Sequence, residues 1–129
     1  MTDPIRPDLY QALLAKHGDR MPPESEVFLR RGWISLVDRL LTDIASEYPD
    51  ARIVGLCGCG WLHIDTSLPA DGRDWTRHVA LDRWLQRYVT ESLSTCECCG
   101  SRHGRDRGER RVVMCDECED QKERCDAHG

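Results

Sequence analysis

Eight cysteines occur among the 129 residues of the chain, and four of them form two pairs with the spacing of metal ligands. Cys96 and Cys99 make the first pair, and after fifteen intervening residues Cys115 and Cys118 make the second. A gap of two residues lets one turn of backbone direct both sulfurs at one ion, and four thiolates are a common ligand set for structural zinc. The spacing therefore predicts a single Zn²⁺ site formed by these four residues.

The residues around the two pairs predict a small zinc finger. Gly100 follows the first pair and can adopt the positive φ that such a turn often needs, which frees backbone N–H groups to donate to sulfur. Residues 110–114 are predicted to form a strand that returns to the second pair. The acidic, helix-favouring run after Cys118 predicts a short helix that begins at this pair, as in treble-clef and zinc-ribbon fingers. Cys98 remains the alternative ligand, although it lacks the two-residue gap within the first pair.

Catalytic uses of these residues fit the sequence less well than a structural site. A redox Cys-x-x-Cys motif would need a strand and helix context and would not need two pairs. A catalytic zinc keeps an open position, which four thiolates close. His103 and Asp106 are reminiscent of an HNH-type nuclease, but a single histidine beside arginines in a loop is more often solvated. We therefore predict that the protein is not an enzyme.

A second metal site can be drawn from the residues that the first site leaves over. Cys57 and Cys59 lie in a glycine-rich turn, and Cys125 and His128 lie near the end of the chain. Together they offer four tetrahedral ligands, which would tie the tail to the turn. The alternative is that these cysteines have no metal role and lie in the structure as small apolar groups.

Charge is distributed unevenly along the C-terminal third. The chain has 18 Lys and Arg against 23 Asp and Glu, a formal net charge of −5, so non-specific binding to duplex DNA is not the default expectation. The predicted loop of the finger is nevertheless rich in arginine, and an acidic segment follows it. The arginines can bind a phosphate or an acidic partner, or they can form ion pairs with the acidic tail of the same finger. They are Arg102, Arg105, Arg107, Arg110 and Arg111.

Three helices are predicted before the finger. Residues 7–17 begin at a proline and end before Gly18. Residues 33–48 carry apolar side chains at i, i+3, i+4 and i+7, which predicts one buried face packed against a hairpin and the third helix. Residues 75–93, capped by Asp74, have apolar positions over roughly 220° at about 100° per residue, so we predict that this helix is central and packed on two sides.

The remaining elements are a short segment and a hairpin. Residues 24–31 form the short segment, and residues 52–56 and 61–65 are predicted strands that flank a turn at residues 57–60. The expected fold is α+β, with helices packed on a β-hairpin and a C-terminal four-cysteine treble-clef or zinc-ribbon finger. We divide the chain into a helical and hairpin body, residues 1–94, and a zinc finger, residues 95–129.

The sequence also predicts a cytoplasmic protein. No stretch approaches the ~20 apolar residues of a membrane helix, so no membrane partner is expected. Asp3, Pro4 and Pro7 lie where a signal peptide would have its apolar run. Cysteine pairs at ligand spacing indicate reduced thiolates that hold a metal more than they indicate a disulfide framework.

Three sequence blocks together resemble a set of short, uncharacterised phage and prophage proteins. Their order and spacing run from about residue 30 to residue 118, and the third block is the most specific. The blocks are Gly32-Trp33 with Leu36, Leu40 and Ile44; Ile53 through Gly60-x-Leu62-x-Ile64; and Glu91-Ser92 leading to Thr95-Cys96-Glu97-x-Cys99-Gly100, closed by Met114-Cys115.

The resemblance implies a zinc finger behind a helical and hairpin body, without an agreed activity. Members of the set usually carry Lys, Glu and Phe in the hairpin turn, where this chain has Cys57-Gly58-Cys59, and often have His at the position of Cys118. We therefore expect a non-enzymatic, phage-type binding protein that engages a host protein in the host cytoplasm. By analogy it would act as an anti-defence or anti-CRISPR inhibitor. The alternative is a nucleic-acid-binding accessory protein that uses the arginine-rich loop.

Overall fold

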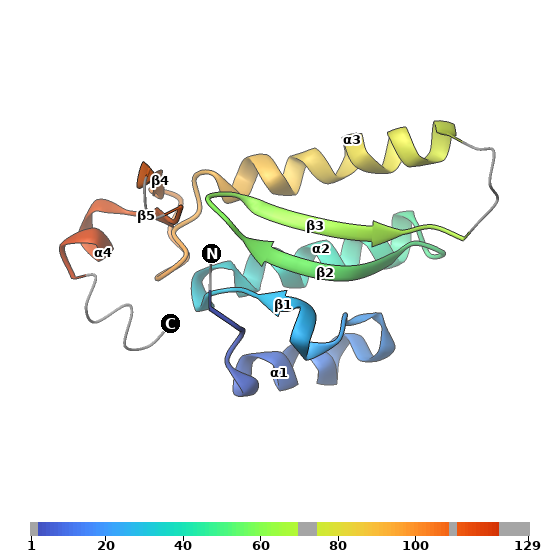
Figure 1. Cartoon of the computed structure of the whole chain (residues 1–129), viewed down its shortest axis with the longest axis horizontal. Helices are drawn as coiled ribbons and strands as arrows, with labels where there is room; N and C mark the ends of the chain where they lie inside the picture. The colour runs from blue at the N-terminus through green and yellow to red at the C-terminus, as the bar shows by residue number, and fades with distance from the viewer. Residues whose placement is uncertain (1–2, 70–74, 109–110, 122–129) are drawn as a thin grey trace.

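The computed structural model describes residues 3–69, 75–108 and 111–121 and has the expected α+β architecture (Figure 1). A three-stranded sheet is surrounded by three helices, and a small C-terminal module lies at one end (Figure 1). The helices are α1 (Pro7–His17), α2 (Ile34–Glu47), α3 (Trp75–Ser92) and α4 (Asp116–Asp120), and the strands are β1 (Val27–Phe28), β2 (Arg52–Gly58), β3 (Leu62–Ser67), β4 (Arg105–Asp106) and β5 (Val113–Met114). Short 3-10 turns occupy Gly18–Arg20, Glu24–Glu26 and Arg31–Trp33.

Helix α2 is the centre of the core. Its apolar stripe is buried as its periodicity predicts, and Trp33, directly before the helix, is also fully buried. Figure 1 shows α2 behind the sheet, where it also contacts α1 and α3. The buried residues of the helix are Leu36, Val37, Leu40, Leu41 and Ile44.

The predicted hairpin is present, but its strands are longer than expected. β2 and β3 are antiparallel, and Cys57 faces His63 across the ladder, so Cys57 and Gly58 belong to the strand and not to the turn. The ladder shifts register between Ile53 and Gly55, which marks a bulge.

A strand that the sequence does not predict lies on the other side of β2. β1 pairs with β2 in parallel, with Val27 opposite Leu56. Two residues cannot show a strand periodicity, and the pairing joins segments far apart in the chain. The predicted segment 24–31 is therefore a 3-10 turn followed by this strand.

Helix α3 has the predicted extent, but the prediction that it is central and packed on two sides is wrong. Leu81, Leu85 and Tyr88 are buried along one face, whereas Trp75 and Val79 are 78% and 45% exposed. Counting every apolar residue overestimates the buried arc, because β3 and α2 cover only one side of the helix. The predicted cap Asp74 lies outside the described residues.

Helix α1 closes the other side of the body. It ends before Gly18, whose φ is +60°, and it contacts α2. Its Tyr10 and Leu13 are buried. The buried core of this body also includes Val113 of β5, so the C-terminal module shares apolar contacts with the body. Among the described helices, none has the length and apolar content that crossing a bilayer requires.

Candidate metal centre

The structure brings the four predicted cysteines of the first site together. The sulfurs of Cys96, Cys99, Cys115 and Cys118 all lie within 4.8 Å of one another, and those of Cys99 and Cys115 are 3.7 Å apart. Thiolates at about 2.3 Å around a tetrahedral zinc would be about 3.8 Å apart. The cluster therefore has the dimensions of a site for one metal ion. Cys98, the alternative ligand, is not part of the cluster.

The first pair lies in a tight turn, called here the knuckle, that directs backbone donors at sulfur. The Cys96 Sγ accepts from the amides of Cys98 and Cys99 at 3.4 and 3.5 Å. The Gly100 amide donates to the Cys96 carbonyl oxygen at 2.9 Å, and Gly100 has a φ of +80°. The predicted role of this glycine is confirmed, because the turn needs a conformation that other residues rarely adopt.

The second pair begins helix α4, as predicted. Cys115 is the N-cap residue, and its Sγ accepts from the Cys118 amide at 3.5 Å. The short hairpin of β4 and β5 connects the two pairs, with Arg105 opposite Met114. A knuckle, a hairpin and a helix that begins at the second pair make up the treble-clef arrangement of a zinc finger.

The metal-free thiols differ in their acidity. Burial opposes ionisation of Cys99, but donors of Ser101 and the neighbouring thiols lower the pKa of Cys99 to about 7. Burial raises the pKa of Cys96 and also that of Cys118. A metal ion would replace these protons with its own charge, so we expect metal binding to compete with protonation of the thiols.

The knuckle is attached to the body by hydrogen bonds across the junction. The Gly32 amide donates to the Glu97 carbonyl oxygen at 2.7 Å, and the indole Nε1 of Trp33 donates to the Thr95 carbonyl oxygen at 2.7 Å. A Cβ atom at Gly32 would lie 2.1 Å from the Cys96 carbonyl oxygen. The finger therefore lies directly on the segment that precedes α2.

Glu97 is an important residue of the site that the ligand spacing does not identify. Its side chain is fully buried, and its Oε2 accepts from the Val113 amide at 2.6 Å, while its own amide donates to the Val113 carbonyl oxygen at 2.8 Å. A buried carboxylate is costly unless it is hydrogen-bonded. Its presence in the third sequence block is a signal, but only the fold shows that Glu97 joins the knuckle to β5.

The arginines of the loop have different surroundings. Arg107 donates to the Met114 carbonyl oxygen at 2.8 and 3.0 Å and to the Asp116 carboxylate at 2.7 Å. Arg105 also pairs with Asp116, at 3.5 Å. These two arginines therefore form the ion pairs with the acidic part of the finger that the sequence analysis gave as one alternative. Arg102 and Arg111 are exposed, and Arg110 lies outside the described residues.

Only two of the four predicted ligands of the second metal site lie in the part of the chain that the structure describes. Cys57 lies in β2 and Cys59 in the turn, and burial raises the pKa of Cys57. Cys125 and His128 lie outside the described residues. Among the described residues, the one group of cysteines, histidines and carboxylates close enough to share a metal ion is the first cluster. The second site stays a prediction.

Comparisons of the chain with protein-family models, with curated proteins and with solved structures found no match. The functional argument therefore rests on the geometry of the site itself.

Proposed function

We propose that Cys96, Cys99, Cys115 and Cys118 bind one Zn²⁺ ion as a closed structural site. The observation that carries the proposal is the convergence of four sulfurs within 4.8 Å. Thiolates from paired turns are the ligand set typical of structural zinc, and four of them leave no position for a water or substrate. The ion would thus contribute stability and not catalysis.

Zinc would make the finger part of one rigid unit with the body. The metal would join the knuckle to the start of α4, and the knuckle is hydrogen-bonded to Gly32 and Trp33 of the body. When the finger and the body are held in one arrangement, they form one continuous surface. Such a surface suits a protein that acts by binding.

We propose a protein partner for that surface, a host protein if the chain is of phage type. The formal charge of −5 and the ion pairs of Arg105 and Arg107 with α4 weigh against nucleic acid as the partner. An anti-defence or anti-CRISPR role is the specific form that the resemblance implies.

Metal content tests the zinc site first. Native mass spectrometry of the intact protein should find one zinc that is lost from Cys99→Ser and retained by the matched variant Cys59→Ser. Full zinc content and unchanged melting of Cys99→Ser would refute the ligand assignment.

Partner capture tests the binding role. Zinc-loaded protein should retain a defined set of host proteins, and the Cys99→Ser variant should not. Strongly salt-dependent retention on DNA or RNA, without protein capture, would instead support the nucleic-acid alternative.

A further inference from the structure

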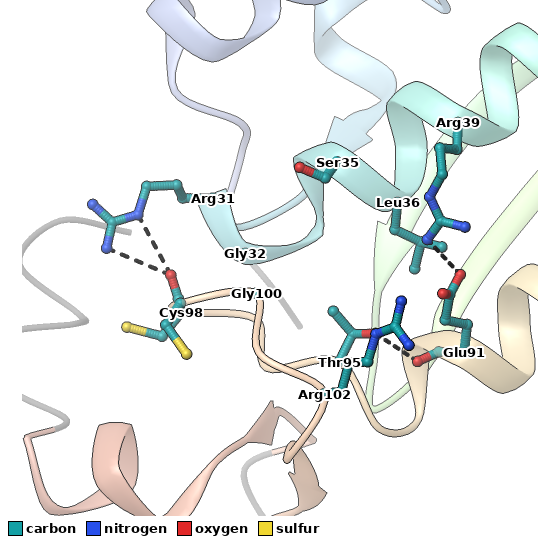
Figure 2. Close-up of a pocket in the computed structure, with 11 residues that line it drawn as sticks. Arg31, Gly32, Ser35, Leu36, Arg39, Glu91, Thr95, Cys98, Gly100 and Arg102 are labelled. Carbon is teal, nitrogen blue, oxygen red and sulfur yellow. Dashed lines mark hydrogen bonds and ion pairs between the residues drawn. The ribbon is translucent and has the colours of Figure 1, made fainter.

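A pocket of about 520 Å³ lies at the junction between the body and the knuckle (Figure 2). One side is formed by the start of α2, including Ser35, and the other by the turn around Gly100. The pocket adjoins the four-sulfur cluster, because Cys99 belongs to the cluster and also lines the pocket. Its walls come from two segments that are far apart in the chain.

The charged groups around this pocket are mainly positive. Arg31, Arg39 and Arg102 line it together with a single carboxylate, that of Glu91. Arg39 pairs with Glu91 at 2.6 Å, whereas no described carboxylate pairs with Arg102 (Figure 2). The side chain of Arg31 reaches the Cys98 carbonyl oxygen at 3.4 Å. In a chain of net charge −5, this is a local excess of positive charge.

The start of α2 adds to this positive potential. The N-terminus of a helix carries unpaired amides and a partial positive charge. In most helices a capping side chain or an acidic residue of the first turn compensates it. Here the N-cap residue Trp33 makes no such side-chain hydrogen bond, and the first turn holds no acidic residue. The Ile34 amide donates to the Arg31 carbonyl oxygen of the preceding 3-10 turn, but no side chain caps the helix start. This first turn, with Ser35 on it, lines the pocket.

We propose that this pocket binds a terminal phosphate group, either free phosphate or a phosphate monoester on a protein. This inference goes beyond the proposed function, since it assigns a ligand class to a pocket that lies beside the metal cluster and is not formed by it. Guanidinium groups match a phosphate with paired hydrogen bonds. The three guanidinium groups and the partial charge of the helix start carry more positive charge than the one carboxylate carries negative charge. This excess favours a ligand with two negative charges. A concave pocket with its guanidinium groups around one space fits a terminal phosphate better than an extended nucleic-acid backbone.

The test is a titration of the zinc-loaded full chain with inorganic phosphate at constant ionic strength, followed by amide chemical shifts. The amides of Ser35 and Gly100 should shift saturably. Arg102→Gln should weaken binding about tenfold or more, because a hydrogen-bonded charge pair is lost. Arg105→Gln, an exposed arginine of the same loop that pairs with Asp116, should change it less than about twofold. Arg31→Gln gives an independent second variant.

Further titrations identify which kind of phosphate the pocket binds. A phosphoserine peptide and its unphosphorylated form distinguish a protein-borne monoester from free phosphate, and an oligonucleotide without terminal phosphate tests the diester. Binding should be tighter at about pH 7.5 than at about pH 5.5, since monoesters gain their second charge near pH 6. Unsaturable shifts, equal weakening by Arg105→Gln, or an oligonucleotide that binds as tightly as the phosphopeptide would overturn the proposal. Unchanged zinc content of the arginine variants separates these outcomes from failure of the metal site.

Discussion

Gly32 lies where the backbone of the finger comes closest to the body. A Cβ atom there would meet the carbonyl oxygen of Cys96 at 2.1 Å and backbone atoms of Glu97 at 2.4 and 2.6 Å. Backbone atoms held by the knuckle cannot move aside as a flexible side chain can. The absence of a side chain at this residue is therefore a condition for the junction.

Replacing Gly32 by alanine should destabilise the protein by roughly 3 kcal/mol, as severe overpacking does. Urea unfolding of the zinc-loaded protein measures this loss. Gly108→Ala is the matched control, since Gly108 has a φ of +61° but no atom within 4 Å of the place that a Cβ would occupy, so only backbone strain of about 1 kcal/mol is expected. Equal losses in the two variants would contradict the steric explanation.

Glu97→Ala should remove the acceptor of the Val113 amide. A buried donor left without a partner costs about 1–3 kcal/mol, and the module should loosen from the body. The exposed Glu117 provides the control, for which alanine should change the free energy of unfolding by less than about 0.5 kcal/mol. Thermal melting compares the two. Identical melting temperatures would show that the buried carboxylate adds no stability.

At the scale of elements, α2 carries the packing of the body. Leu40 is fully buried in its apolar stripe, so Leu40→Ala should cost roughly 2 to 5 kcal/mol through lost burial and the cavity left behind. Leu93, which is 49% exposed, is the matched position for comparison. Chemical denaturation should find a small change for Leu93→Ala. A loss below about 0.5 kcal/mol for Leu40→Ala would show that this face is not core.

The contact between α1 and α2 should respond to acid. Asp38 of α2 lies 2.8 Å from Lys16 Nζ and 2.7 Å from His17 Nε2, and the Lys16 hydrogen bond is the main cause that lowers the pKa of Asp38. A carboxyl group whose pKa is lower in the folded state stabilises the fold above its unfolded pKa of about 4. That contribution is lost as the pH decreases through the folded value.

Asp38→Asn should therefore lower stability at neutral pH and make the decline between about pH 5 and about pH 2 less steep. Denaturation at a series of pH values measures both effects. Lys16→Met should change the profile in the same direction, because it removes the main interaction that favours the charged carboxylate. A wild-type slope in Asp38→Asn would show that this contact does not contribute to the acid response.

At the scale of the whole molecule, zinc should couple the finger to the body. Structural zinc contributes on the order of 10 kcal/mol in small fingers, so a strong chelator should unfold the knuckle and release its hydrogen bonds to the body. Amide hydrogen exchange should accelerate at Cys98, Cys99 and Gly32 together. Protection at Leu40, within α2, serves as the internal reference. Faster exchange at the cysteines with unchanged exchange at Gly32 would mean that the junction does not depend on the metal.

Local patterns in the sequence predicted the parts of the fold that depend on neighbouring residues. The helix 7–17, the apolar stripe of α2 and the two hairpin strands follow from periodicity and from proline and glycine at the ends. The four clustered cysteines follow from ligand spacing. In each case the information lies within one turn, one strand or one pair of ligands, where chain geometry limits the choices.

Contacts between distant segments were decided only by the tertiary structure. The parallel pairing of β1, the exposure of the first turns of α3 and the contact of Gly32 with Glu97 all depend on which surfaces meet. The pocket lined by Arg31, Arg39 and Arg102 has the same origin, because these residues line one space only when the knuckle packs on the start of α2. Periodicity specifies which side of an element is apolar, but packing determines which of its residues another element covers.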